Sequence, residues 1–100
     1  MRVIAHGNLV AYWTRHPECR VALEYWYRRI KAASPQTMSE MQAMFVKAKV
    51  LNAERVRFEV HGGDHRLVAA FDFRNQRVFL KFLGTHAEYD RVDALTVSMF

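Results

Sequence analysis

The chain has 100 residues, of which 51% are hydrophobic and 13% aromatic, and its formal net charge is +5. This length and apolar content predict one globular domain, residues 1–100, and exclude a disordered chain. The single cysteine, Cys19, excludes an internal disulfide and a cysteine metal cluster.

No apolar run approaches the roughly 18 residues of a membrane span. The N-terminus, MRVIAHGNLV, lacks the long apolar region of a signal peptide. We therefore expect a cytoplasmic protein that does not associate with a membrane. The positive charge favours an acidic partner, with nucleic acid first, although small basic proteins also use such charge for solubility alone.

The first part of the chain has helical patterns. Met1–Ile4 predicts a short strand, and Asn8 is a plausible N-cap for a helix over Leu9–Arg15. Pro17 interrupts that helix and suits the first position of a second one, because the residue before a proline avoids helical backbone. The second helix carries one apolar stripe, formed by Cys19, Leu23, Trp26 and Ile30.

A capping box predicts a third, short helix. In Thr37-Met38-Ser39-Glu40, a threonine at the N-cap is followed three residues later by a glutamate. We expect Met41, Phe45 and Ala48 to share one side of this helix. Lys49 would then lie near its end, where a cation suits the helix dipole.

From Asn52 onward the apolar period changes to two, which predicts strands. The expected strands are Arg55–Val60, Arg66–Phe73 and Val78–Leu83. The sequence HGGD between the first two is a strong turn signal. The order of elements predicts an α+β fold, with helices first, then an antiparallel meander, then a short C-terminal helix.

The register of the first hairpin brings charged residues together. If Val60 lies opposite His65, then Glu59 faces Arg66, and Arg57 projects from the same side of the sheet as Arg66. The alternative reading is a plain ion pair between Arg66 and Glu59 on a solvated face, which is common and contributes little.

The register of the next hairpin decides the side of Lys81. If Phe73 lies opposite Arg77, then Arg66 falls beside Gly84, and Lys81 points to the other face of the sheet unless a bulge intervenes. The cluster that this register favours comprises Arg57, Arg66, His86 and Tyr89.

Structural and chemical signals converge in VFLKFLGTHAEYD, residues 78–90. Lys81 stands inside a buried strand, which is costly unless its ammonium group reaches solvent or an anion. Gly84 ends the strand, and Thr85-His86-Ala87-Glu88 fits a second capping box. His86 and Tyr89 share one face of the helix that follows, near an N-terminus that favours a phosphate.

The sequence resembles the HigB-like toxins of bacterial toxin–antitoxin pairs, within the RelE/ParE superfamily. The resemblance covers nearly the whole chain: it opens with MRVIA and an aromatic-rich helix, continues through ERVRFEVHGGDHRLVAAFDF, and is sharpest at FLGTHAEYDRVDA. It implies a compact α+β fold, with two N-terminal helices packed on a curved antiparallel β-sheet. It also implies a ribosome-dependent messenger-RNA endoribonuclease that cuts codons in the A site. The expected partner is a helix-turn-helix antitoxin, and operator DNA would be contacted only through the antitoxin complex.

The resemblance also assigns site residues. Metal-free RNA cleavage by the ribose 2′-hydroxyl needs a base, cations for the phosphorane and an acid. Arg66 of HRLV matches the family's phosphate-stabilising arginine, His86 of GTHAEYD matches the acid–base position, and Tyr89 matches a base-stacking or proton-relay position. Lys81 completes the expected catalytic set, although many relatives have arginine there and lysine offers only a point charge. The expected RNA-binding residues are Arg57, Arg55 and Lys49.

No metal or cofactor is predicted. His61 and His65 flank the turn and stand four residues apart, but no third metal ligand is evident near them in the sequence. Two other functions stay open: a toxin of the same fold that inhibits DNA gyrase, as ParE-like relatives do, and a non-catalytic RNA- or ribosome-binding module. The histidine–tyrosine motif after the last strand favours the nuclease.

Overall fold

The alternating segment from residue 55 onward forms the long strands of a five-stranded sheet in the computed structural model, which describes residues 1–100. The strands are β1 (Arg2–Ile4), β2 (Lys49–Val50), β3 (Arg55–Val60), β4 (His65–Asp72) and β5 (Arg77–Thr85). The helices are α1 (His6–Arg15), the 3₁₀ turn η1 (Pro17–Cys19), α2 (Arg20–Ala32), α3 (Met38–Met44) and α4 (His86–Tyr89). The strand order is β1-β5-β4-β3-β2, and only β1 pairs in parallel. The predicted α+β class is confirmed.

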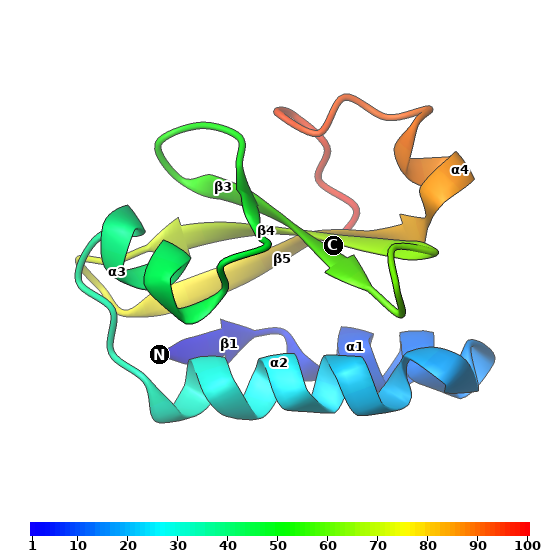
Figure 1. The fold of residues 1–100 in the computed structure, drawn as a ribbon, viewed down its shortest axis with the longest axis horizontal. Coiled ribbons are helices and arrows are strands. Elements are labelled where there is room, and N and C mark those ends of the chain that lie inside the picture. The colour runs from blue at the N-terminus through cyan, green and yellow to red at the C-terminus, as the bar shows by residue number, and fades with distance from the viewer.

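The core lies between the sheet and the two N-terminal helices, which cover one of its faces (Figure 1). The predicted stripe of α2 is buried in this core: Cys19, Leu23, Trp26 and Ile30. From the sheet, Val56, Phe58 and Leu67 belong to the same core, and the Phe58 ring meets the Trp26 ring edge to face. None of the helices combines the length and the apolar character that crossing a membrane requires.

The expected start of the first helix is wrong. The helix begins at His6 with Ala5 as its N-cap, and the backbone N–H of Asn8 already donates to the Ala5 carbonyl over 3.1 Å. Asn8 therefore lies inside the first turn and cannot cap it. Pro17 opens η1, which runs directly into α2, so the break predicted at Pro17 is confirmed.

The third helix is shorter than predicted. Thr37 caps it as expected, because its side-chain oxygen accepts the Glu40 backbone N–H over 3.2 Å. The helix ends at Met44, where Phe45 leaves helical backbone. Lys49 consequently stands in the edge strand β2 and not at a helix end.

The predicted register of the first hairpin is confirmed, with Val60 opposite His65 and Glu59 opposite Arg66. In the second hairpin, the pair Arg66–Gly84 is confirmed, but Arg77 lies opposite Asp72 and not Phe73. The difference is a one-residue bulge.

The bulge sits at Lys81, which is the extra residue of β5. Val68 pairs with Phe82 and Ala69 pairs with Leu80, so no residue of β4 is left for Lys81. Leu80 and Leu83 both join the core, whereas Phe82 is buried outside it. Two consecutive side chains, Lys81 and Phe82, therefore project from the face opposite the core. This returns Lys81 to the face of Arg57 and Arg66.

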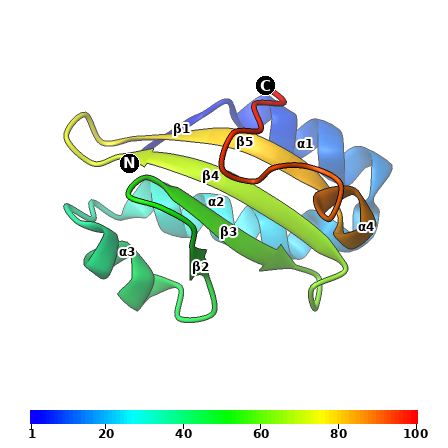
Figure 2. The same cartoon turned by 90° about the horizontal axis from the view of Figure 1, so that it is seen from above.

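The last residues of the chain run across the sheet face that α1 and α2 leave uncovered (Figures 1 and 2). The guanidinium of Arg55 donates to the carbonyls of Ala94 and Val97 over 3.0 and 2.7 Å. The Met99 N–H donates to the Lys81 carbonyl over 2.9 Å. This C-terminal tail, residues 90–100, adds a partial third layer to the fold.

Candidate functional site

A basic face, consisting of Lys49, Arg57, Arg66 and Lys81, occupies the side of the sheet turned away from the core. Lys49 lies directly opposite Arg57 across β2 and β3, so their side chains share one face. The hairpin register adds Arg66, and the bulge adds Lys81. The prediction that Arg57 and Arg66 project from the same side is confirmed.

Glu59 joins the two arginines. Its Oε1 atom lies 3.4 Å from Nη2 of Arg57 and 3.8 Å from Nη2 of Arg66. Arg66 also donates from Nη1 to the carbonyl of Gly63. The Nε atoms of both arginines are buried without an acceptor. The ion pair between Arg66 and Glu59 that the sequence suggested is therefore present. Each guanidinium also has an N–H donor without an acceptor in the protein.

Lys81 is held differently from the arginines. None of the eight ion pairs includes a lysine, so its ammonium group has no carboxylate partner. Its Nζ atom lies 5.7 Å from the centre of the Phe79 ring. The charge is thus only half-buried over an aromatic surface and is not neutralised within the chain.

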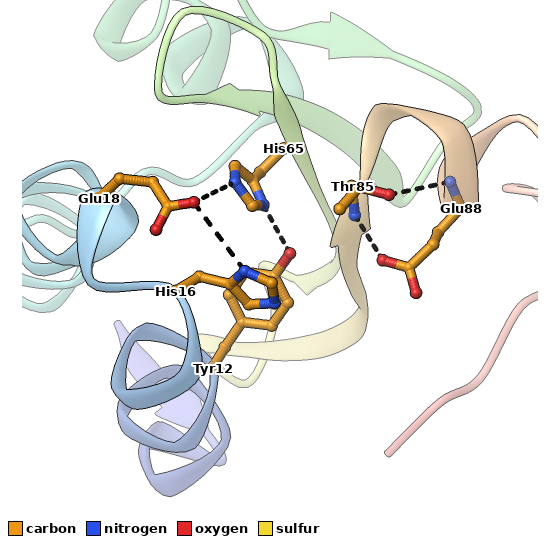
Figure 3. Close-up of polar contacts among 6 residues, drawn as sticks. All are labelled: Tyr12, His16, Glu18, His65, Thr85 and Glu88. Atoms are coloured by element: carbon orange, nitrogen blue, oxygen red, sulfur yellow. Dashed lines mark hydrogen bonds and ion pairs between the residues drawn. The ribbon is translucent and has the colours of Figure 1, made fainter.

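The short helix α4 follows β5 directly and presents His86. The predicted capping box is confirmed: Thr85 Oγ1 accepts the Glu88 N–H over 3.2 Å, and the Glu88 carboxylate accepts the Thr85 N–H over 2.8 Å (Figure 3). The His86 N–H donates to the Asp64 carbonyl over 2.9 Å. This bond ties the start of α4 to the turn that precedes Arg66.

The His86 imidazole has an acidic neighbour that the sequence analysis missed. Its Nδ1 atom lies 3.0 Å from Oδ2 of Asp90, and both side chains are more than half exposed. The spacing of four residues on a helix is the signal that could have found this pair. A carboxylate at Nδ1 leaves Nε2 facing solvent and available to a substrate.

Tyr89 is positioned by a second residue that the sequence analysis missed. The Tyr89 ring meets the Phe82 ring edge to face, with 6.0 Å between centres. Phe82 lies opposite Val68 and projects from this face, next to the extra residue Lys81. The ring of Phe82 thus supports Tyr89 from the strand that precedes α4.

Arg55 differs from the other predicted RNA-binding residues. It belongs to the same sheet face, but its side chain is buried and its guanidinium is engaged by the C-terminal tail. The structure leaves Lys49 and Arg57 on the open part of the face and places Arg55 under the tail.

The arrangement combines two chemical capacities. A row of arginine and lysine side chains can bind a phosphodiester, the arginines in bidentate fashion. An exposed imidazole on the adjoining helix can act as a general acid or base. The Arg66–Gly84 pair fixes how the cationic strand and this helix meet, since His86 follows Gly84 by two residues.

Comparison with known proteins identifies a family and a relative that this chain resembles. Residues 19–92 match the sequence model of the HigB toxin family, described as the RelE-like toxic component of a toxin–antitoxin system. A relative from Escherichia coli O6:H1, named mRNA interferase HigB, is 32% identical over 95 residues. The match covers 92% of this chain and 91% of that protein.

Proposed function

Because the chain belongs to the HigB family of RelE-like toxins, the toxic components of toxin–antitoxin systems, we propose that it is a ribosome-dependent messenger-RNA endoribonuclease. It cuts codons in the ribosomal A site and thereby stops translation. The name of the Escherichia coli relative, an mRNA interferase, supports RNA as the substrate.

The reaction is a transesterification that needs no metal. The ribose 2′-oxygen attacks the adjacent phosphorus, the bond from phosphorus to the 5′-oxygen breaks, and a 2′,3′-cyclic phosphate and a 5′-hydroxyl result. One proton leaves the 2′-hydroxyl and one reaches the 5′-oxygen. His86 transfers the proton at one of these two steps, with Asp90 orienting its ring at 3.0 Å.

The observation that carries the proposal is the bulge at Lys81. Without it, strand alternation would turn this lysine into the core; with it, Lys81 joins Arg57 and Arg66 on one face. These cations hold the phosphate and stabilise the charge that develops on its oxygens in the transition state. A lysine without a carboxylate partner suits an anionic ligand.

Tyr89 contributes an aromatic surface beside the imidazole. Its ring is supported by Phe82 and is half-exposed. It stacks on a base of the codon or relays a proton. Stacking of this kind is worth about 1–3 kcal/mol per base.

The partner of this toxin is an antitoxin protein of the helix-turn-helix class, which neutralises it in the cytoplasm. Operator DNA is contacted only through the toxin–antitoxin complex. Because the basic face is positively charged, RNA binding also weakens as the salt concentration rises.

Primer extension on a translated message tests the proposal, with the wild type, His86→Ala and a matched control, His61→Asn. His61 is exposed in the β3–β4 turn at a φ of 53°, a backbone region that asparagine tolerates. We expect new 5′ ends at codon spacing with wild type and control, and none with His86→Ala. A message with a single 2′-deoxyribose before the cut phosphate should resist cleavage at that position only.

Three outcomes would contradict parts of the proposal. Cleavage that survives His86→Ala moves the proton transfer to Tyr89 or Lys81. Cleavage that survives the 2′-deoxy substitution excludes attack by the 2′-oxygen. Growth arrest without cleavage, with ribosomes present, excludes the nuclease and leaves gyrase inhibition, seen as broken DNA, or ribosome binding alone.

A further inference from the structure

Three side chains with metal-binding atoms converge on the helix-covered side of the sheet. They are His16 at the end of α1, Glu18 in η1 and His65 at the start of β4 (Figure 3). Their nearest ligand atoms all lie within 4.8 Å of one another. Nε2 of His65 is 3.2 Å from Oε2 of Glu18, and Nδ1 of His16 is 3.9 Å from the same oxygen.

The chain geometry at η1 creates this convergence. Pro17 ends α1 and starts a 3₁₀ turn, so the side chains on its two sides, His16 and Glu18, are both directed toward β4. The rings of His16 and His65 have their centres 5.0 Å apart. The candidate ligands that accompany His65 therefore come from a distant part of the sequence. The nearby turn histidine His61 is not one of them.

His65 is already oriented as a metal ligand would be. Its Nδ1 atom is hydrogen-bonded to the Tyr12 hydroxyl over 2.7 Å, and its side chain is 6% exposed. Ligating histidines usually engage their second ring nitrogen with an oxygen atom, which fixes the ring and leaves the other nitrogen for the ion. Here the free direction is that of Nε2, which faces Glu18.

We propose that His16, Glu18 and His65 form a Zn²⁺ site that fastens the α1–α2 connection to the start of β4. Two imidazoles and a carboxylate, with water in the fourth position, are a known donor set for this ion. A tetrahedral site with bonds of about 2.0–2.1 Å spaces its ligand atoms about 3.3 Å apart. The His65–Glu18 distance already matches this spacing, and the partly exposed His16 and Glu18 have the freedom to close the remainder.

At His65 itself, binding requires only a tautomer change. Without the ion, Nε2–H donates to Glu18 and Nδ1 accepts from the Tyr12 hydroxyl. With Zn²⁺ on Nε2, the proton resides on Nδ1 and is donated to the Tyr12 oxygen. In both arrangements each ring nitrogen of His65 has a partner, so the site is stable without metal and competent to accept it.

The site is separate from the basic face. His65 and Arg66 are consecutive in β4, so their side chains project from opposite faces of the sheet. The ion therefore cannot bind a phosphate held by Arg66. Its role is structural, because it links residues 16 and 65 across a long loop and stabilises only the folded chain.

The test uses untagged protein that has been stripped with a chelator and dialysed, titrated with Zn²⁺ by calorimetry. We expect one equivalent to bind and the melting temperature to rise with Zn²⁺ concentration. Glu18→Gln and His16→Ala each lower the affinity by roughly 100-fold or more, since the loss of outer partners alone costs 10–100-fold. Tyr12→Phe, which removes only the orienting oxygen, lowers it by about 10–100-fold.

The matched control is His61→Asn, which removes a histidine four residues from His65 but outside the cluster, and it should bind like the wild type. Circular dichroism shows whether each variant is folded. Failure of the wild type to bind Zn²⁺ above the level of Glu18→Gln overturns the proposal. So does equal loss in His61→Asn, which would place the ion at the turn. Neither result depends on RNA cleavage.

Discussion

Arg66 of β4 lies directly opposite Gly84 of β5, at the point where the sheet passes into α4. A β-carbon at Gly84 would lie 2.5 Å from Cζ of Phe82 and 3.3 Å from Cβ of Glu88. The missing side chain thus makes room for the ring that supports Tyr89 and for the helix that carries His86.

Gly84→Ala should therefore destabilise the protein by about 1–3 kcal/mol, because the rigid Phe82 ring must shift. Urea unfolding measures this change. Gly7→Ala in α1 is the control, since a β-carbon there meets nothing within 4 Å, and alanine suits a helix. Equal stability of the two variants would show that Phe82 yields without cost.

Lys81→Ala should weaken RNA binding and lower the slope of log affinity against log salt by about one, because one phosphate contact is lost. Lys31→Ala is the control, since Lys31 belongs to α2 on the other side of the sheet. Filter binding at several salt concentrations measures the slope. An unchanged slope for Lys81→Ala would remove this lysine from the RNA-binding surface.

Asp90→Asn should slow cleavage by about 10–100-fold, less than the 10²–10⁴-fold typical of removing an acid–base group itself. The reason is the 3.0 Å contact that orients the His86 ring. Stability should change by less than about 1 kcal/mol, because both side chains are exposed. Single-turnover rates measure the effect, with Glu24→Gln on α2 as control. A rate like that of the control would leave His86 without an orienting partner.

The capping box of α4 should lose strength in acid. The Thr85 N–H, which donates to Glu88, holds the pKa of that carboxyl below its ordinary value of 4.5, and the charges of His16 and Arg91 act in the same direction. A lowered carboxyl pKa adds stability above the ordinary value, and this contribution is lost as the pH falls through the lowered one. Glu88→Gln should thus be less stable than the wild type at neutral pH, with the difference disappearing below pH 4.5. Unfolding curves across pH measure it, and a constant difference would contradict the linkage.

Arg55→Lys should release the C-terminal tail. The arginine makes two hydrogen bonds to tail carbonyls that lysine cannot reproduce in the same geometry, and bonds to a charged group contribute about 1.5–3 kcal/mol each. Hydrogen exchange at the Met99 amide, which is bonded to Lys81, should quicken. Arg74→Lys in the exposed β4–β5 turn is the control. Unaltered exchange in Arg55→Lys would show that the tail is held by other contacts.

Local patterns in the sequence predicted most of the fold. The capping box at Thr85, the break at Pro17 and the register at Val60 depend on neighbouring residues, and all three are confirmed. The predicted N-cap at Asn8 failed because the chain enters α1 from β1 three residues earlier, with Ala5 as the N-cap. The start of a helix after a strand is decided by packing, which the local pattern does not contain.

Two features of the sites required the folded chain. Strand alternation places Lys81 correctly only when the bulge is known, and a bulge of one residue has no clear signature in VFLKFLG. The tail that covers Arg55, and the approach of His16 to His65, join residues about forty or more positions apart. Contacts of such separation follow from topology and not from spacing.

The bulge has a consequence for saturation mutagenesis of β5. Tolerance to polar substitution should be lowest at the core positions Val78 and Leu80, which are two residues apart. The next minimum should fall at Leu83, three residues after Leu80, because of the bulge. Suppose that sheet faces are assigned by counting alternate residues along the strand. Lys81 and the aligned residue of a relative that lacks the extra residue would then be assigned to opposite faces. Alignments of related toxins should therefore be anchored at the core leucines Leu80 and Leu83, and not at a fixed distance from the preceding turn.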